Sequence, residues 1–291
     1  MARLTHFLLA SEWRAAFISS FLLFLPLLSW LGPSVVALFV LRRGVWPIPA
    51  IVLFPFAVSI AMGIVFEEPT IAVVLGVTII LATVLHHTLS WLMVLKFAFA
   101  ISLTLVFFTG KFYEETLQNL VAAIKKVILA NRDLKALGVD EVIIDAYMAS
   151  FAIGALSFVY MVSSFCALAF ARAAQAQAFN PGGFKAEFEK ILLSPGFAGI
   201  CLTFAVVGLV TDPWMLRLTP VSFLPLIFAG MALVHGLSDI RKSKAVLLIF
   251  YAALLFFTPY LLLLLGLFAA IDTLVDFRQR ARKEIPLKED K

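Results

Sequence analysis

The chain has 291 residues, of which 63% are hydrophobic and only 14% are charged. A soluble domain averages about 25% charged residues, and its core cannot absorb so many long apolar runs. Composition therefore excludes an ordinary soluble protein and indicates that the bilayer is the solvent for most of the chain. The net charge of +5 does not indicate a nucleic-acid partner, because the basic residues stand in short pieces between apolar runs.

The apolar runs are continuous rather than alternating, which is typical of helices and not of barrel strands. Hydrocarbon offers no hydrogen bonds, so a spanning segment must pair its own backbone groups. We therefore predict an all-α, polytopic helical membrane protein with about 8–10 membrane segments, some of them short or re-entrant hairpins.

The two cysteines, Cys166 and Cys201, both lie inside apolar segments, and no CxxC or His/Cys ligand spacing occurs. We expect neither a disulfide framework, nor a metal site, nor a cofactor. At the N-terminus a polar stretch, 11–14, interrupts the apolar run, which favours a retained interfacial segment over residues 1–14 rather than a cleaved signal peptide.

The first apolar run, about 15–42, is too long for one upright span. At 1.5 Å per residue it would reach about 42 Å, against a hydrocarbon core of about 30 Å. It contains Gly32-Pro33, and basic residues stand at both of its ends, Arg14 and Arg42-Arg43. Because basic loops stay in the cytoplasm, these residues favour a hairpin that returns to its starting side. A single curved helix is the alternative.

Three further runs are expected as helices, at about 46–65, 71–88 and 89–109. The segment 111–146 differs, because it carries five basic and six acidic residues with apolar residues at helical spacing. We predict that it is an amphipathic extramembrane segment. A span over about 147–172 follows, and its end has small residues four apart, such as Ala167 and Ala171, which allow close helix packing.

A polar island over 180–194 separates this span from the next runs, at about 196–213 and 219–236. Asn180-Pro181-Gly182-Gly183 is a turn and cap signal. Phe184, Phe188 and Ile191 then share one helical face, so we predict a short cytoplasmic helix lying in the membrane interface. A plain connecting loop is the alternative.

The last run, about 245–275, is again too long for one upright span and is broken by Thr258-Pro259. We predict a second hairpin there, followed by a polar cytoplasmic tail over 276–291. Residues 15–275 then form a single membrane-embedded domain.

Charge sets the expected topology. If both long runs are hairpins, the cytoplasmic side holds 16 of the Lys and Arg residues, the outer side holds six, and Lys96 stays in the membrane. If both are single spans, the loops at Arg42-Arg43 and Arg241–Lys244 move outside and break the positive-inside rule. We therefore expect both termini in the cytoplasm.

Several marks along the chain resemble the YybS-like family of predicted bacterial integral membrane proteins, whose function is unknown. The marks occur in the family's order across nearly the whole chain. They include Arg42, Arg43, Gly44, Asn180, Pro181, Gly182, Gly183, Phe184, Glu187, Phe188, His235 and Arg278.

The resemblance implies a protein of the bacterial cytoplasmic (inner) membrane. The family is distantly similar to the substrate-binding S components of energy-coupling-factor vitamin transporters, which implies capture of a small molecule and work with partner subunits. The S components carry an Ala-xxx-Ala docking pattern on their first helix. This chain departs from that pattern, because it has Ala16 with Ser20 there.

Four polar residues are candidates for ligand binding or transport. Lys96 stands inside an apolar run, where it either contacts an anion in a site or snorkels to the interface. Asp272 and Asp276 share a helical face, as a proton or cation site requires, or form ion pairs at a helix end, such as Asp276 with Arg280. His235 ends a later span at the expected cytoplasmic side, where histidine can move protons.

The sequence leaves three hypotheses open: a small-molecule binding or uptake component, a structural or assembly subunit of a membrane complex, and an intramembrane enzyme acting on lipid. No P-loop or nucleophile-elbow motif occurs, so we expect no enzymatic activity. The expected partners are the lipid bilayer and other membrane subunits, with no nucleic acid. A binding component should show an outward cavity among residues 46–109 and 196–236, whereas an assembly subunit should show a flat apolar face rich in small residues.

Overall fold

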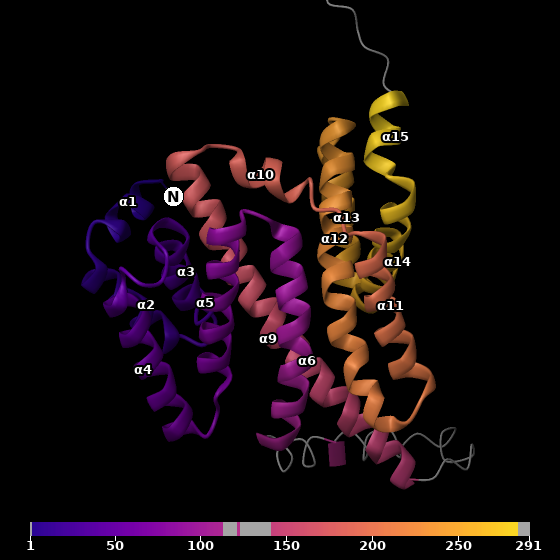
Figure 1. Ribbon diagram of the computed structural model, residues 1–291, viewed down its shortest axis with the longest axis horizontal. Coiled ribbons are helices and arrows are strands. Elements are labelled where there is room, and N and C mark those ends of the chain that lie inside the picture. The colour runs from indigo at the N-terminus through magenta and orange to yellow at the C-terminus, as the bar shows by residue number, and fades with distance from the viewer. Residues whose placement is uncertain (1, 113–120, 123–140, 285–291) are drawn as a thin grey trace, which may run out of the picture. The chain divides into compact units, whose positions relative to one another are not determined.

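The computed structural model describes residues 2–112, 121–122 and 141–284, and every regular element within these ranges is helical (Figure 1). This confirms the predicted all-α class. The elements are α1 (Ala2–Leu9), α2 (Glu12–Leu23), α3 (Leu31–Arg43), α4 (Pro49–Phe66), α5 (Thr70–Thr88), α6 (Trp91–Phe112), α9 (Glu141–Phe179), α10 (Gly183–Phe188), α11 (Pro195–Val210), the 3-10 helix η1 (Pro213–Arg217), α12 (Leu218–Ile240), α13 (Lys244–Phe256), α14 (Thr258–Val275) and α15 (Phe277–Glu284).

Within the described residues, six helical stretches are long and apolar enough to cross a membrane. They are Pro49–Phe66, Thr70–Thr88, Trp91–Gly110, Asp145–Phe179, Pro213–Ile240 and Thr258–Val275. The apolar helices α11 and α13 are shorter than a full span. The chain is therefore a polytopic helical membrane protein.

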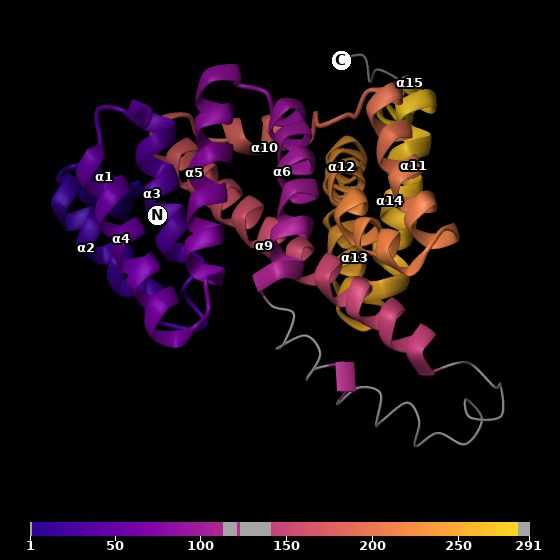
Figure 2. The same ribbon diagram turned by 60° about the horizontal axis from the view of Figure 1, so that its bottom comes forward.

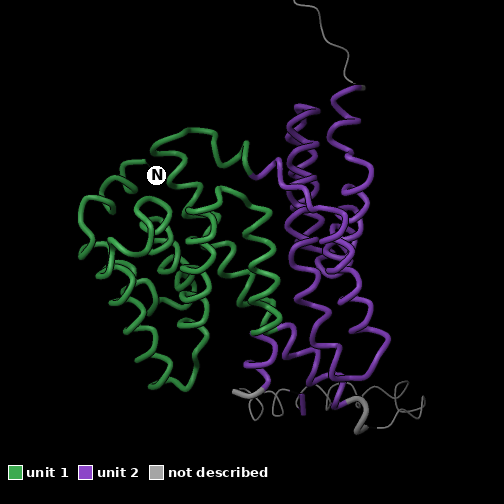
Figure 3. The backbone as a smooth tube through the Cα atoms, viewed as in Figure 1, with its two compact units in different colours: residues 1–104, 156–187 green, residues 105–155, 188–291 purple. Residues whose placement is uncertain are grey.

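The structure divides into two compact units, each built from separate parts of the chain (Figure 3). Unit 1 comprises residues 1–104 and 156–187, and unit 2 comprises residues 105–155 and 188–291. The long helices α6 and α9 each contribute to both. Most of the predicted extramembrane segment, 111–146, lies outside the described residues, as does the polar tail beyond residue 284.

In unit 1, the first apolar run forms two short antiparallel helices, α2 and α3, as the hairpin prediction requires. The Ser19 hydroxyl donates to the Gly32 carbonyl over 2.8 Å, and a Cβ at Gly32 would lie only 2.9 Å from the Ser19 carbonyl oxygen. The chain reverses over residues 24–30, before Gly32-Pro33. Pro33 lies in the first turn of α3. Backbone N–H groups there have no acceptor within the helix, so proline costs no hydrogen bond.

The remaining helices of unit 1 run beside this hairpin. The Ser164 hydroxyl of α9 donates to the Val74 carbonyl of α5 over 3.2 Å, and Thr70 bonds Tyr160 over 3.1 Å, so α5 and α9 are parallel. Near the other end of α5, His86 Nδ1 donates to the carbonyl of Leu41 in α3 over 3.1 Å. The last turns of α3 and α5 therefore meet at one end of the unit.

In unit 2, α12 is the central helix, and Figures 1 and 2 show α11, α12 and α14 side by side. Gly230 of α12 packs against Leu265 of α14, where an added Cβ would lie 2.5 Å from the Leu265 carbonyl oxygen. Nearer the C-terminal end of α12, Gly236 packs against Arg278, just beyond α14. These contacts make α14 parallel to α12.

The last apolar run is also a hairpin. A tight turn, 241–243, connects α12 to α13, and the Tyr251 hydroxyl of α13 lies 3.0 Å from His235 Nε2 of α12. Helix α13 therefore runs back along α12, and α14 returns in the opposite direction. The break falls at Phe257, one residue before the predicted Thr258-Pro259.

We expect Gly230→Ala to destabilise unit 2, because the added methyl meets backbone rather than a movable side chain. Overpacking of this kind costs about 1–3 kcal/mol. Gly199 of α11 is the matched control, since an added Cβ there meets nothing within 4 Å. Thermal unfolding of the purified protein should show a lower midpoint for Gly230→Ala and an unchanged or higher one for Gly199→Ala. Equal midpoints would contradict the close approach of α12 and α14.

Candidate functional site

The motif residues 180–188 build a turn and a short helix at the end of the second segment of unit 1, which closes at Glu187. Gly182 has φ +86°, a left-handed conformation that glycine adopts without strain. The Gly183 N–H donates to the Asn180 carbonyl over 2.9 Å, and a Cβ at Gly183 would collide with the Asn180 side chain. Helix α10 then covers only Gly183–Phe188, shorter than the predicted helix over 180–194.

Glu187 anchors this short helix through what we call the Arg172–Glu187 network. Both nitrogens Nε and NH2 of Arg172 donate to the Glu187 carboxylate, with Nε to Oε2 at 3.0 Å. Trp91 Nε1 donates to the same carboxylate over 3.3 Å, and the Trp91 ring stacks edge-on to Phe184 with centroids 5.9 Å apart. A forked guanidinium on a carboxylate fixes orientation as well as distance.

The network continues from Arg172 to the end of α3. Arg172 NH1 donates to Gln175 Oε1 over 3.0 Å, and Gln175 Nε2 donates to the Leu41 carbonyl over 3.3 Å. His86 donates to the same carbonyl, so the Leu41 carbonyl in the last turn of α3 accepts two hydrogen bonds from side chains. Gly44 ends α3 with φ +76° and lies against the His86 ring.

In unit 2, Asp272 and Arg278 form a buried ion pair. Asp272 is 1% exposed and Arg278 is 7% exposed, and NH2 of Arg278 lies 2.7 Å from Asp272 Oδ2. The other carboxylate oxygen accepts the Phe277 N–H over 2.8 Å. The pair closes the end of α14, where Asp276 has φ +46° and stops the helix.

Arg278 also holds the segment that follows α10. Its two terminal nitrogens donate to the carbonyls of Glu189 and Ile191, over 2.6 and 2.9 Å. Gly236 makes room for this, because a Cβ there would lie 3.0 Å from Arg278 Cδ and 3.2 Å from the Glu189 carbonyl oxygen. Removal of a buried charge of this kind leaves its partner uncompensated.

The side chains of the remaining predicted site residues belong to neither ion pair. Asp276 caps α15, its carboxylate accepting the Gln279 N–H over 3.0 Å, while Arg280 Nε donates to the Val275 carbonyl. His235 Nδ1 donates to the Met231 carbonyl over 2.8 Å, its Nε2 faces Tyr251, and its ring meets Phe188 edge-on. Lys96 is half-buried in α6. Among the described residues, no three His, Cys, Asp or Glu side chains gather as a metal site would require.

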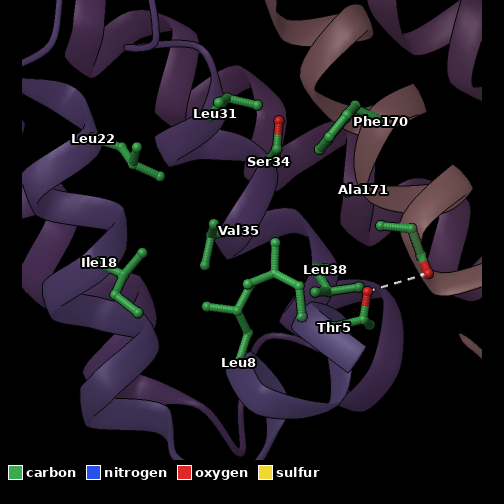
Figure 4. Close-up of a pocket in the computed structure, with 12 residues that line it drawn as sticks. Thr5, Leu8, Ile18, Leu22, Leu31, Ser34, Val35, Leu38, Phe170 and Ala171 are labelled. Atoms are coloured by element: carbon green, nitrogen blue, oxygen red, sulfur yellow. Dashed lines mark hydrogen bonds between the residues drawn. The ribbon is translucent and has the colours of Figure 1, made fainter. Parts of the chain in front are cut away.

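One feature with room for a ligand is an apolar cavity of about 320 Å³ in unit 1 (Figure 4). Four helices form its wall: α1, α2, α3 and α9. The lining residues are Leu4, Thr5, Leu8, Ile18, Leu22, Leu31, Ser34, Val35, Leu38, Phe170, Ala171 and Ala174. Sequence reasoning did not find it, although the spacing of Leu31, Ser34, Val35 and Leu38 marks one helical face.

Both hydroxyls in the wall are engaged with backbone. The Ser34 hydroxyl donates to the Trp30 carbonyl over 3.0 Å. The Thr5 hydroxyl donates to the Ala174 carbonyl over 3.4 Å, the contact drawn as a dashed line in Figure 4. The cavity wall is therefore hydrocarbon in character, and it suits an apolar occupant.

Comparison with known proteins identifies no relative: no family model, no curated protein and no solved structure matches this chain.

We expect Asp272→Asn to cost about 3–5 kcal/mol of stability, because Arg278 would remain buried without its counter-charge. Asp276→Asn is the matched control, since asparagine caps a helix about as well as aspartate. Thermal unfolding and membrane abundance should fall for the first variant and stay near the parent values for the second. Similar losses for both variants would contradict the assignment of the buried charge to Asp272.

We also expect Glu187→Gln to loosen α10, because the amide keeps the shape but loses the charge that holds Arg172. The rate of trypsin cleavage of the purified protein measures the opening of α10, since Lys185 and Lys190 flank Glu187 and are exposed. A half-exposed ion pair is worth about 1 kcal/mol, so cleavage through local opening should be about fivefold faster. Glu68→Gln, at the turn between α4 and α5, should leave the rate unchanged. An unchanged rate in Glu187→Gln would show that the network does not hold α10.

Proposed function

We propose that this polytopic membrane protein is a small-molecule binding component whose ligand is apolar and enters the cavity of unit 1. The observation that carries the proposal is the cavity itself, about 320 Å³ bounded by α1, α2, α3 and α9. Small-molecule sites have volumes of about 300–1,000 Å³, and apolar side chains dominate their walls.

The size of the cavity limits the ligand. An engineered apolar cavity of about 150 Å³ holds one benzene molecule, so this cavity has room for roughly a dozen carbon atoms. Its walls offer almost no polar surface, because Thr5 and Ser34 both bond to backbone carbonyls. Inside the cavity, shape and hydrophobicity rather than hydrogen bonds select the hydrocarbon that fits.

The place of the cavity changes the expected mode of capture. A binding component was expected to hold its ligand among residues 46–109 and 196–236, facing outward. The cavity instead lies among residues 4–38 and 170–174, along the α2–α3 hairpin, whose open end carries Arg42 and Arg43. Under the charge-based topology this is the cytoplasmic side of a bacterial inner membrane. The proposed ligand is then taken from the inner leaflet or the cytoplasm.

Burial of the small-residue face favours binding over a purely structural role. An assembly subunit would present small residues on a free apolar face. Ala167 and Ala171 are instead buried, and Ala171 lines the cavity. The resemblance to YybS-like proteins, and through them to transporter S components, points in the same direction. Partner subunits that use the captured molecule are part of this proposal.

A photoactivatable long-chain alcohol tests the proposal in native membranes. It is uncharged, and the residues that it labels are identified by mass spectrometry. We expect labelling at Phe170–Ala174 above the level at α13, whose exposed residues report general contact with lipid. Ala174→Phe adds bulk inside the cavity and should lower that labelling severalfold, because the room for about half of the ligand is lost.

Ala252→Phe is the matched control, because Ala252 is exposed on α13. It should leave labelling at Phe170–Ala174 unchanged. Labelling of the cavity wall at the level of α13, in the parent protein, would overturn the proposal.

A further inference from the structure

The cavity has a long axis, which the pairing of α2 with α3 defines. These helices meet at Ser19 and Gly32. At 1.5 Å per residue, Leu22 lies about 4 Å from that contact, toward the hairpin turn. Leu38 lies about 9 Å from the contact in the other direction, so the two residues are about 13 Å apart along the axis. The cavity thus extends along the hairpin, and Figure 4 shows Ile18, Leu22 and Val35 directed into one shared space.

Two arginines stand near the end of this axis that lies opposite to the hairpin turn. Arg14 lies on the face of α2 that carries Ile18 and Leu22, at i, i+4 and i+8. Arg42 lies on the face of α3 that carries Leu38, four residues earlier. From the same contact, Arg14 lies about 7 Å and Arg42 about 15 Å away, both in the direction opposite to the hairpin turn.

Arg14 contacts α1 directly, and Arg42 is connected to α1 through Phe179. Arg14 lies over the Phe7 ring at 3.8 Å and donates to the Phe7 carbonyl, one residue before the cavity-lining Leu8. Arg42 lies over the Phe179 ring at 4.3 Å, and Phe179 meets His6 of α1 edge-on. Positive charge therefore flanks the helix that closes the apolar space.

Arg14 retains an unused donor. Its Nε is buried and has no hydrogen-bond partner in the structure. Buried polar atoms without partners are rare in native proteins, and each calls for an explanation such as an ion or ligand. The nearest acid on the same helix, Glu12, is engaged elsewhere, since its carboxylate accepts the Ile51 N–H over 3.1 Å.

We propose that the ligand of this cavity is an anionic amphiphile, whose hydrocarbon chain fills the space between α1, α2, α3 and α9 and whose acidic head group is bound by Arg14 and Arg42. This inference rests on the proposed function and adds the head group to it. An acidic head group at this end of the cavity would pair with the two guanidinium groups, of which Arg14 keeps one donor, Nε, that no protein atom uses. Fatty acids and acidic phospholipids share this chemistry.

Photolabelling with three probes of the same chain tests the inference. The probes are a long-chain fatty acid, the matching alcohol, and a phosphatidylglycerol carrying that chain, each with the photoactivatable group at the same carbon. We expect the fatty acid to label Phe170–Ala174 about tenfold more efficiently than the alcohol, as one charge-assisted hydrogen bond allows. Arg14→Gln and Arg42→Gln should each reduce this ratio toward one while leaving the alcohol's labelling unchanged.

Arg43→Gln is the matched control. Arg43 is the next residue along α3, is exposed, and has its guanidinium above Phe39, which is not part of the cavity wall. This variant should keep the parent ratio. Stronger labelling by phosphatidylglycerol than by the fatty acid would assign the head group to a membrane lipid, and the reverse would assign it to a free acid.

Two failures are distinguishable. If the alcohol labels the cavity as well as both acidic probes do, the anionic head group is excluded and the apolar site remains. If none of the three probes labels Phe170–Ala174 above α13, both the inference and the proposed function are overturned.

Discussion

The absence of hydrogen-bonding solvent around the chain is the constraint on which the structure depends. In hydrocarbon, each backbone and side-chain polar group must find its partner within the protein. This explains why the described residues form helices, and why the breaks in the two hairpins are short. It also explains why the charges nearest the core, Asp272 with Arg278 and Glu187 with Arg172, are paired. Arg14 Nε and Ser20 Oγ depart from this rule, since both are buried without a hydrogen-bond partner in the structure. The proposed anionic head group rests on the first of these departures.

The same constraint connects the motif residues to the rest of each unit. Glu187 ties α10 to α9 and α6 through Arg172 and Trp91 in unit 1, and Arg278 ties the segment after α10 to the end of α14 in unit 2. Glu187 is thus fixed by Arg172 within unit 1, and the backbone of Glu189 and Ile191 is fixed by Arg278 within unit 2.

Much of the fold follows from local sequence. Run length against bilayer thickness predicts both hairpins, and glycine at positions 44 and 182 marks left-handed turns. The turn in the first hairpin falls earlier than Gly32-Pro33, because proline is accommodated in the first turn of a helix. The partner of Asp272 was not predictable from helical spacing. The helix stops at Asp276 in a left-handed conformation, so Arg278, six residues on, folds back onto Asp272. The cavity was not predictable either, since one of its four walls, α9, lies far along the chain from α1, α2 and α3.

The most direct test of the account is an experimental structure of the protein purified from its native membrane in a mild detergent. The account predicts elongated density along the α2–α3 hairpin, from Leu22 past Leu38, ending in a head group with an oxygen within hydrogen-bonding distance of Arg14 Nε. A cavity that is empty, or that is filled by the protein's own side chains with Arg14 bonded within the chain, would contradict it.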